Sequence, residues 1–324
     1  MYICGNSTCH ASRKISAPRQ VFLFLSMKFE KIYSTIDDQI TILKERGMFF
    51  EDEKKAKYYL SNISYYRLSA YWYTFLKQPQ SDHLFHEDAT FQKALDTYVF
   101  DRKLRLIVFN EIERIEIALR AQLICQYCSR YGSNWYEDKS HFKKHDYYIK
   151  FNFLLTELMN KTSEVFIRHY KKKYTEPSNP PAWMALELAS FGQLSMLFKN
   201  LKNDAARKSI AEHFAIHENV LCSWFECLSY IRNNCAHHMR LWNRKLPKTP
   251  MMPSVTKNGW INTTDPEMGN RLYYSLCVIR YLLNQISPGN SFPKKVNDLL
   301  LEFPNVPQNY MGFTTEWAKE DLWK

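Results

Sequence analysis

The amino-acid sequence predicts an all-α protein, and three observations support this prediction. Apolar residues recur at three- and four-residue steps in two long segments, which is the period of an amphipathic helix. No segment shows the apolar–polar alternation of a series of strands. No glycine-rich phosphate loop is present either. The apolar positions are Leu104, Val108, Ile112, Ile115, Leu119 and Leu123 in the first segment, and Leu272, Leu276, Ile279, Leu283 and Ile286 in the second.

Local signals predict three shorter helices before the first long segment. A threonine at the start, acids in the first turn and a glycine at the end predict a helix over 35–47. Further helices are expected over 52–60 and 64–76, followed by a polar linker over 78–89. These elements form an expected N-terminal helical subdomain.

The third of these helices carries Tyr65, Tyr66 and Arg67 in succession. Packing between large aromatic rings is the simpler explanation for so many tyrosines. The alternative is a surface around Arg67 on which nucleic-acid bases stack. Both interpretations remain open from the sequence.

The polar side of the long helix over 104–123 carries Glu113, Glu116 and Arg120. Glu116 and Arg120 are four residues apart, in the order that favours an ion pair on a helix. They form either a solvated, salt-bridged face or, together with Glu113, a group that orients a functional site elsewhere in the chain.

The remaining chain also reads as helical. Helices are expected around 152–161, 163–172 and 203–216, and another begins at Glu218. A proline-rich turn comes before the segment 183–195. The expected units are 28–90 as the N-terminal subdomain, 91–290 as the main helical domain and 291–324 as a tail that packs on the core. Residues 1–27 are expected to be an extension, either a disordered tail or the product of start-codon choice.

The charge balance favours an anionic partner. The 324 residues include 44 Lys and Arg against 33 Asp and Glu, a net charge of +11, which favours nucleic acid before membrane. No stretch approaches the 18 consecutive apolar residues of a membrane-spanning helix. The eight cysteines show no extracellular disulfide pattern, so we expect reduced thiols in a cytoplasmic protein.

The segment 231–244 holds the densest polar chemistry in the chain, with three Arg, three Asn and two His in fourteen residues. Asn233 and His237 are four apart and share a helix face, whereas Arg232 lies about 140° around the helix from His237. Arg232 and His237 therefore serve one site only through the length of the arginine, a distorted last turn or a second copy of the helix. Arginine suits a phosphate, and histidine exchanges a proton near neutral pH. This pair fits cleavage of RNA by its own 2′-hydroxyl without a metal.

Two other patterns are not assigned a function. Cys125, Cys128, His141 and His145 have the C-x2-C-x12-H-x3-H spacing of a zinc finger, but glycine and aspartate occupy the places where that finger needs apolar residues. Cys235 is two residues from His237, so on a helix the two side chains point apart and no thiol nucleophile is expected.

Several blocks of the sequence resemble one family. The Arg232-Asn-x-x-x-His237 motif resembles the R-x(4–6)-H motif of HEPN ribonucleases, and the run 232–244 closely resembles the AbiD/AbiF-type abortive-infection (Abi) phage-resistance proteins of bacteria. The resemblance extends over roughly 28–324. Further matching blocks are Tyr65 to Leu68, Phe100 to Arg120, Trp183 to Ser195 and Met311 to Trp317.

The resemblance implies a HEPN-like helical bundle and a metal-independent endoribonuclease of phage defence, with no cofactor. Arg232 would neutralise the transition state, His237 would move a proton, and Asn233 would hold the imidazole or a phosphate oxygen. Two motifs would pair in a homodimer to form one composite cleft. RNA is the expected partner, and some relatives are associated with a small non-coding RNA. The neighbouring or RNA-positioning candidates are His238, Arg240, Arg244, Glu113, Glu116, Arg120 and Arg67.

Two alternatives remain. A non-catalytic RNA-binding protein could keep this framework and bind phosphate without cutting. A purely structural cluster could cap the end of a helix, where cations are favoured by the helix dipole, although three arginines, three asparagines and two histidines exceed what a cap needs.

Overall fold

The computed structural model describes residues 32–256, 259–261 and 266–324. Within these residues the chain forms twelve α-helices and several short 3-10 helices, with no strand. The all-α prediction is therefore confirmed. The extension expected over 1–27 lies outside the described residues.

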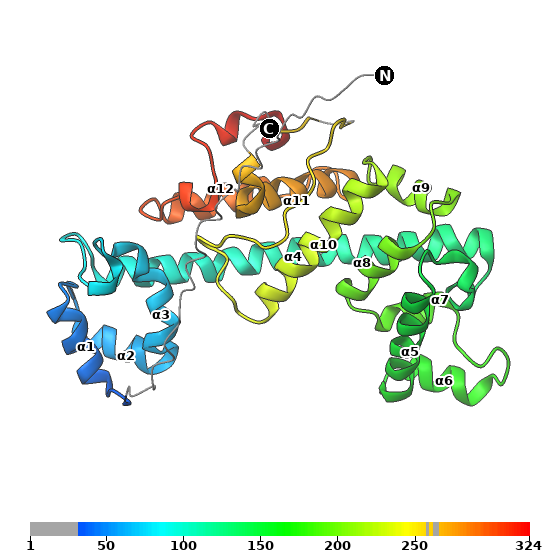
Figure 1. Ribbon diagram of the computed structural model, residues 1–324, viewed down its shortest axis with the longest axis horizontal. Helices are drawn as coiled ribbons and strands as arrows, with labels where there is room; N and C mark the ends of the chain where they lie inside the picture. The colour runs from blue at the N-terminus through cyan, green and yellow to red at the C-terminus, as the bar shows by residue number, and fades with distance from the viewer. Residues whose placement is uncertain (1–31, 257–258, 262–265) are drawn as a thin grey trace, which may run out of the picture.

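One long helix, α4 (Phe91–Tyr131), runs through the molecule (Figure 1). Its first turn is capped by the Thr90 hydroxyl, which accepts from the Lys93 amide at 3.1 Å. The C-cap residue after Tyr131 is Gly132, whose φ of 88° favours glycine. The apolar stripe predicted between Leu104 and Leu123 is buried along its whole length. Helix α4 packs against α3, α9, α10, α11 and α12.

Three short helices lie under the N-terminal end of α4: α1 (Ile36–Glu45), α2 (Glu53–Ile63) and α3 (Tyr65–Trp72) (Figure 1). The cap predicted at the first helix is present, because Thr35 and Asp38 form a reciprocal capping box. The three helices enclose a hydrophobic cluster of their own. Phe91 and Ala94 of α4 complete that cluster, so the long helix belongs to both cores.

The other helices surround the remaining length of α4. Helix α10 packs against α4, α8, α9 and α11 and so lies near the centre of the larger core. Helices α5, α6 and α7 gather at the far end of α4 (Figure 1). The bounds are α5 (His145–Lys161), α6 (Val165–Lys173), α7 (Ala182–Ala185), α8 (Phe191–Asn200), α9 (Ala205–His213), α10 (Glu218–Ala236), α11 (Leu272–Ile286) and α12 (Phe292–Glu302).

Helix α11 is buried on nearly every side, which explains why its sequence is apolar beyond the predicted stripe. Tyr273 is fully buried and packs against Phe313 and Trp323 from the C-terminal segment. The last residues of the chain thus cover one side of α11 and lie above it in Figure 1.

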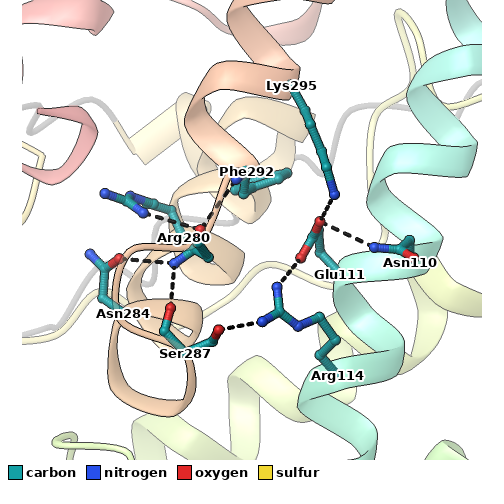
Figure 2. Close-up of polar contacts among 9 residues, drawn as sticks. Asn110, Glu111, Arg114, Arg280, Asn284, Ser287, Phe292 and Lys295 are labelled. Atoms are coloured by element: carbon teal, nitrogen blue, oxygen red, sulfur yellow. Dashed lines mark hydrogen bonds and ion pairs between the residues drawn. The ribbon is translucent and has the colours of Figure 1, made fainter.

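A buried carboxylate links α4 to α12 (Figure 2). Glu111 is fully buried and accepts from Lys295 at 2.7 Å and from Arg114 at 3.0 Å. Arg114 also donates to the Ser287 hydroxyl just after α11. Burial raises the pKa of Glu111, but the hydrogen bonds and charges of Lys295 and Arg114 outweigh it, so the net shift of the pKa is downward.

Glu111→Gln is expected to lower the free energy of unfolding at pH 7 by about 1–3 kcal/mol, because hydrogen bonds to a buried charge are lost. The pKa of Glu111 is lower in the folded protein than its ordinary value of 4.5. At pH values above 4.5, the ionised carboxylate therefore stabilises the folded state. That contribution disappears as the pH falls through the lowered folded pKa. Urea unfolding between pH 7 and pH 3 checks both effects.

In that series, wild type and Glu111→Gln should converge in stability at acid pH. Glu302→Gln on α12 is the matched control, because its half-exposed ion pair with Lys103 contributes little. Parallel curves for wild type and Glu111→Gln would contradict the proposed linkage.

Candidate functional site

The polar segment 231–244 begins on α10 and continues past its end. The helix stops at Ala236, His237 is its C-terminal cap residue, and His238 adopts a left-handed conformation with φ of 56°. The amide of His238 donates to the Cys235 carbonyl at 3.1 Å and the amide of Met239 to the Asn234 carbonyl at 2.8 Å. This is a Schellman ending with a histidine where glycine is usual.

The loop after α10 is held by two arginines that cross between it and α3. Arg67 of α3 donates to the backbone carbonyl of His238, and Arg240 of the loop donates to the backbone carbonyl of Ala70 on α3. Both arginines are partly buried. The reciprocal pair fixes the motif against the N-terminal helices, and this is where the structure places Arg67, His238 and Arg240.

Asp101 of α4 anchors the same loop from below. Its Oδ1 accepts from the amides of Leu241 at 3.0 Å and Trp242 at 2.7 Å, and its Oδ2 accepts from the Tyr71 hydroxyl at 2.7 Å and from Arg105. Asp101 is fully buried. Burial raises its pKa, while Arg105 and the three other donors oppose that shift.

Arg232 points toward α4. Its Nε lies 3.6 Å from Oε2 of Glu116, and its guanidinium stacks over the Phe109 ring at 5.4 Å from the centroid. Its side chain is 31% exposed, and its Nη atoms donate to no other residue that the structure describes. These atoms remain available for an anion.

The Arg232 guanidinium lines a pocket of about 280 Å³ together with Glu113, Glu116 and Arg120. Arg120 donates to Glu116 at 3.3 Å and to the carbonyls of Leu186 and Ala189. Glu116 therefore lies between two arginines from α4 and α10. The list of lining residues is completed by Phe109 and Ile117.

Glu116 and Arg120 are not on a solvated face, because each side chain is only 12% exposed. Burial raises the pKa of Glu116, against the opposing charges of Arg232 and Arg120. Of the two interpretations open from the sequence, the geometry favours a group that positions Arg232. Glu113 remains exposed at the rim.

His237 and Asn233 are both exposed on one side of the end of α10. The His237 imidazole forms no hydrogen bond or ion pair with any residue in the described part of the chain, and none joins it to Arg232. The angular separation predicted for Arg232 and His237 stays a prediction.

Other residues of the segment have structural partners. Arg244 donates to the Asn234 side chain at 2.8 Å, and Asn234 in turn donates to the Tyr230 carbonyl. Burial raises the pKa of the Cys235 thiol to about 12, which agrees with the expectation that it is not a nucleophile. A role for Arg244 in contacting RNA stays a prediction.

Sequence reasoning missed Asp101, Tyr71 and Phe109 as parts of this site. Asp101 and Arg105 are four residues apart on the apolar stripe of α4, a position where a charged pair is unusual. That spacing was the available signal for the anchor. Tyr71 and Phe109 carried no signal, since aromatic residues are frequent on both helices.

Comparison with protein families bears on the same region. The family model described as Abi-like protein matches residues 58–243, more than half of the chain. The chain belongs to the Abi-like protein family. The match begins within α2 and ends in the loop after α10, so it contains α3, the Asp101 anchor and the whole Arg232 pocket. Neither the curated proteins nor the solved structures yielded a match.

Membership of the Abi-like family indicates a role in abortive-infection phage defence. In the described part of this Abi-like chain, none of the helices has the length and apolar character needed to cross a membrane.

The left-handed residue of this Abi-like chain allows a direct stability test. His238→Gly is expected to raise the free energy of unfolding by up to about 1 kcal/mol, because the Cβ atom of a non-glycine residue is strained in the left-handed conformation. Thermal or urea unfolding measures the change. Lower stability in the variant would contradict this expectation and would show that the His238 imidazole itself stabilises the fold.

Proposed function

We propose that this Abi-like protein is a metal-independent endoribonuclease of the HEPN superfamily, of the AbiD/AbiF type, acting in the cytoplasm during phage infection. The observation that carries the proposal is that both side chains of the Arg-x4-His motif have polar groups available to a ligand. Arg232 keeps its Nη donors free in a pocket, and His237 stands exposed and unpaired within the described residues. Such side chains contribute little to folding, which favours a role with a ligand.

The proposed chemistry uses the 2′-hydroxyl of RNA as the nucleophile. Its oxygen attacks the adjacent phosphorus while the bond to the 5′-oxygen breaks, which leaves a 2′,3′-cyclic phosphate and a 5′-hydroxyl end. His237 takes the proton from the 2′-oxygen or returns one to the leaving 5′-oxygen. The Arg232 guanidinium neutralises the charge on the phosphoryl oxygens, where electrostatic stabilisation has its largest effect. Asn233, exposed beside His237, supplies an amide to the imidazole or to the phosphate.

We propose that the active form is a homodimer. Acid–base cleavage needs two proton-handling groups on opposite sides of the phosphate, and one chain supplies one His237. Arg232 and His237 face different directions on α10, so a second α10 related by a twofold axis would bring one chain's arginine to the other chain's histidine. The partners proposed are a substrate RNA and a second protomer, with a small non-coding RNA as a further partner.

The test is expression of wild type, Arg232→Ala and His237→Ala in a bacterial host, with growth and RNA ends followed during phage challenge. Wild type is expected to produce new 5′-hydroxyl ends and growth arrest, and both variants to lose both effects. If wild type leaves RNA intact throughout the challenge, or if both variants still arrest growth, the catalytic proposal fails.

A non-catalytic RNA-binding protein is the alternative, supported by the +11 net charge and by the Arg232 guanidinium in its pocket, which could hold a phosphate without cutting. It predicts that RNA copurifies equally with wild type and both variants and is never cut. The capping alternative predicts instead that Arg232→Ala and His237→Ala lower the free energy of unfolding but keep biological activity in the folded protein.

A further inference from the structure

A second and larger pocket lies between the N-terminal helices, apart from the Arg232 site. It measures about 710 Å³, within the range of small-molecule and nucleotide sites. Its walls come from the start and end of α1, the length of α3 and the segment after it. The lining residues are Tyr33, Ser34, Gln39, Ile42, Arg46, Ser64, Tyr65, Tyr66, Ser69, Trp72, Tyr73, Leu76, His83 and Phe85.

Aromatic rings are presented to solvent in this pocket. Tyr66 is 89% exposed and Tyr73 is 51% exposed. Trp72 forms a buried wall and meets Tyr65 edge to face at 5.1 Å between ring centroids. Rings this exposed contribute little to the core, so the packing explanation for the tyrosine-rich helix does not account for Tyr66 and Tyr73.

The polar groups of the pocket suit an anionic, hydrogen-bonding ligand. Its lining contains Arg46 and His83 but no carboxylate. Arg46 donates to the Tyr65 hydroxyl at 3.2 Å, which sets its guanidinium beside the rings. The Gln39 side-chain amide donates to the Ser34 carbonyl at 2.9 Å, and the Ser69 hydroxyl donates to the Tyr66 carbonyl at 2.7 Å. The oxygen atoms of these two side chains add acceptors of the kind that read base edges. The Arg232 pocket differs, because two glutamates line it.

Helix α3 connects this pocket to the motif. Tyr66 and Ser69 line the pocket, while Arg67 and Ala70 bind the loop that carries His238 and Arg240. A ligand in the pocket would therefore contact α3 residues that are direct chain neighbours of those that hold the motif loop. Helix α3 is only eight residues long.

We infer that the pocket on α3 binds unpaired bases of single-stranded RNA, stacked on Tyr66 and Tyr73 with the backbone phosphates near Arg46. Stacking on aromatic side chains is tolerant of sequence because every base has a π face. The site positions the strand on the side of α3 away from the motif loop. This inference rests on the proposed function only in taking RNA as the ligand; it does not require cleavage.

The experiment measures fluorescence anisotropy of a fluorescein-labelled short oligouridylate with full-length His237→Ala protein, in which the proposed cleavage is blocked. Adding Tyr66→Ala or Tyr73→Ala is expected to weaken binding by about tenfold, the effect of one lost base stack. Tyr58→Ala is the matched control, since Tyr58 is an exposed tyrosine of the same helices that does not line the pocket. An oligouridylate carrying 4-thiouridine is expected to cross-link to Tyr65, Tyr66 or Tyr73.

The outcomes separate this inference from the proposed function. Binding that falls with Tyr66→Ala and Tyr73→Ala but not with Tyr58→Ala supports the pocket, even if wild type never cuts RNA. Equal binding by all three variants, or cross-links confined to α10 and its loop, overturns the pocket, even if wild type cleaves RNA. No detectable binding of the oligouridylate also overturns it.

Discussion

His237→Ala is expected to slow RNA cleavage by the purified protein by about 10²- to 10⁴-fold, the usual contribution of one general acid or base. The fold should be unaffected, because the imidazole is exposed and has no partner in the described part of the chain. The free energy of unfolding should stay within about 0.5 kcal/mol of wild type, as for most surface substitutions. Single-turnover kinetics and urea unfolding measure the two effects on the same protein.

His169→Ala is the control for this prediction, since His169 is an exposed histidine on α6 at the far end of the molecule. It should leave both cleavage and stability unchanged. An unchanged cleavage rate in His237→Ala would remove the histidine from the reaction. A large loss of stability would instead mean that His237 contributes to the fold.

Asp101→Ala is expected to have the opposite profile, with a loss of about 3–5 kcal/mol in the free energy of unfolding. The substitution leaves Arg105, the Tyr71 hydroxyl and two backbone amides without their acceptor in a fully buried site. The loop after α10 would lose its attachment to α4. Urea unfolding reports the loss directly.

A second variant separates the buried charge from the lost hydrogen bonds. Asp101→Ala combined with Arg105→Met removes the unpaired guanidinium and should recover part of the stability, so the two effects are not additive. Asp298→Ala is the control, because its exposed pair with Lys294 contributes little. A loss below about 1 kcal/mol in Asp101→Ala would show that the anchor does not hold the loop.

Much of the fold could be predicted from the sequence, because helices carry their period in the chain. The stripe from Leu104 to Leu123 is buried as expected, and the helix predicted to begin at Glu218 begins there. Its end was harder to predict. The turn at His238 uses a left-handed histidine, and without a glycine or proline the sequence contains no stop signal there.

The candidate site was predictable in its residue types but not in its contacts. Arg232, His237 and the group on α4 stood out because polar clusters are unusual on buried helices. The bond from Arg67 to the His238 carbonyl joins residues far apart in the chain, and no local pattern records such a pairing. Asp101 was overlooked for a related reason: a buried carboxylate looks like any other acid until its donors are known.

Phe91 and Ala94 limit where the chains of two such proteins can be joined. These two side chains belong to the long helix, yet they complete the cluster built by α1, α2 and α3. A gene split at residue 90 would therefore expose apolar surface on both products. Exchanging the N-terminal helices between relatives should succeed only when the first turns of α4 are exchanged with them, which makes residue 95 or later the better crossover point.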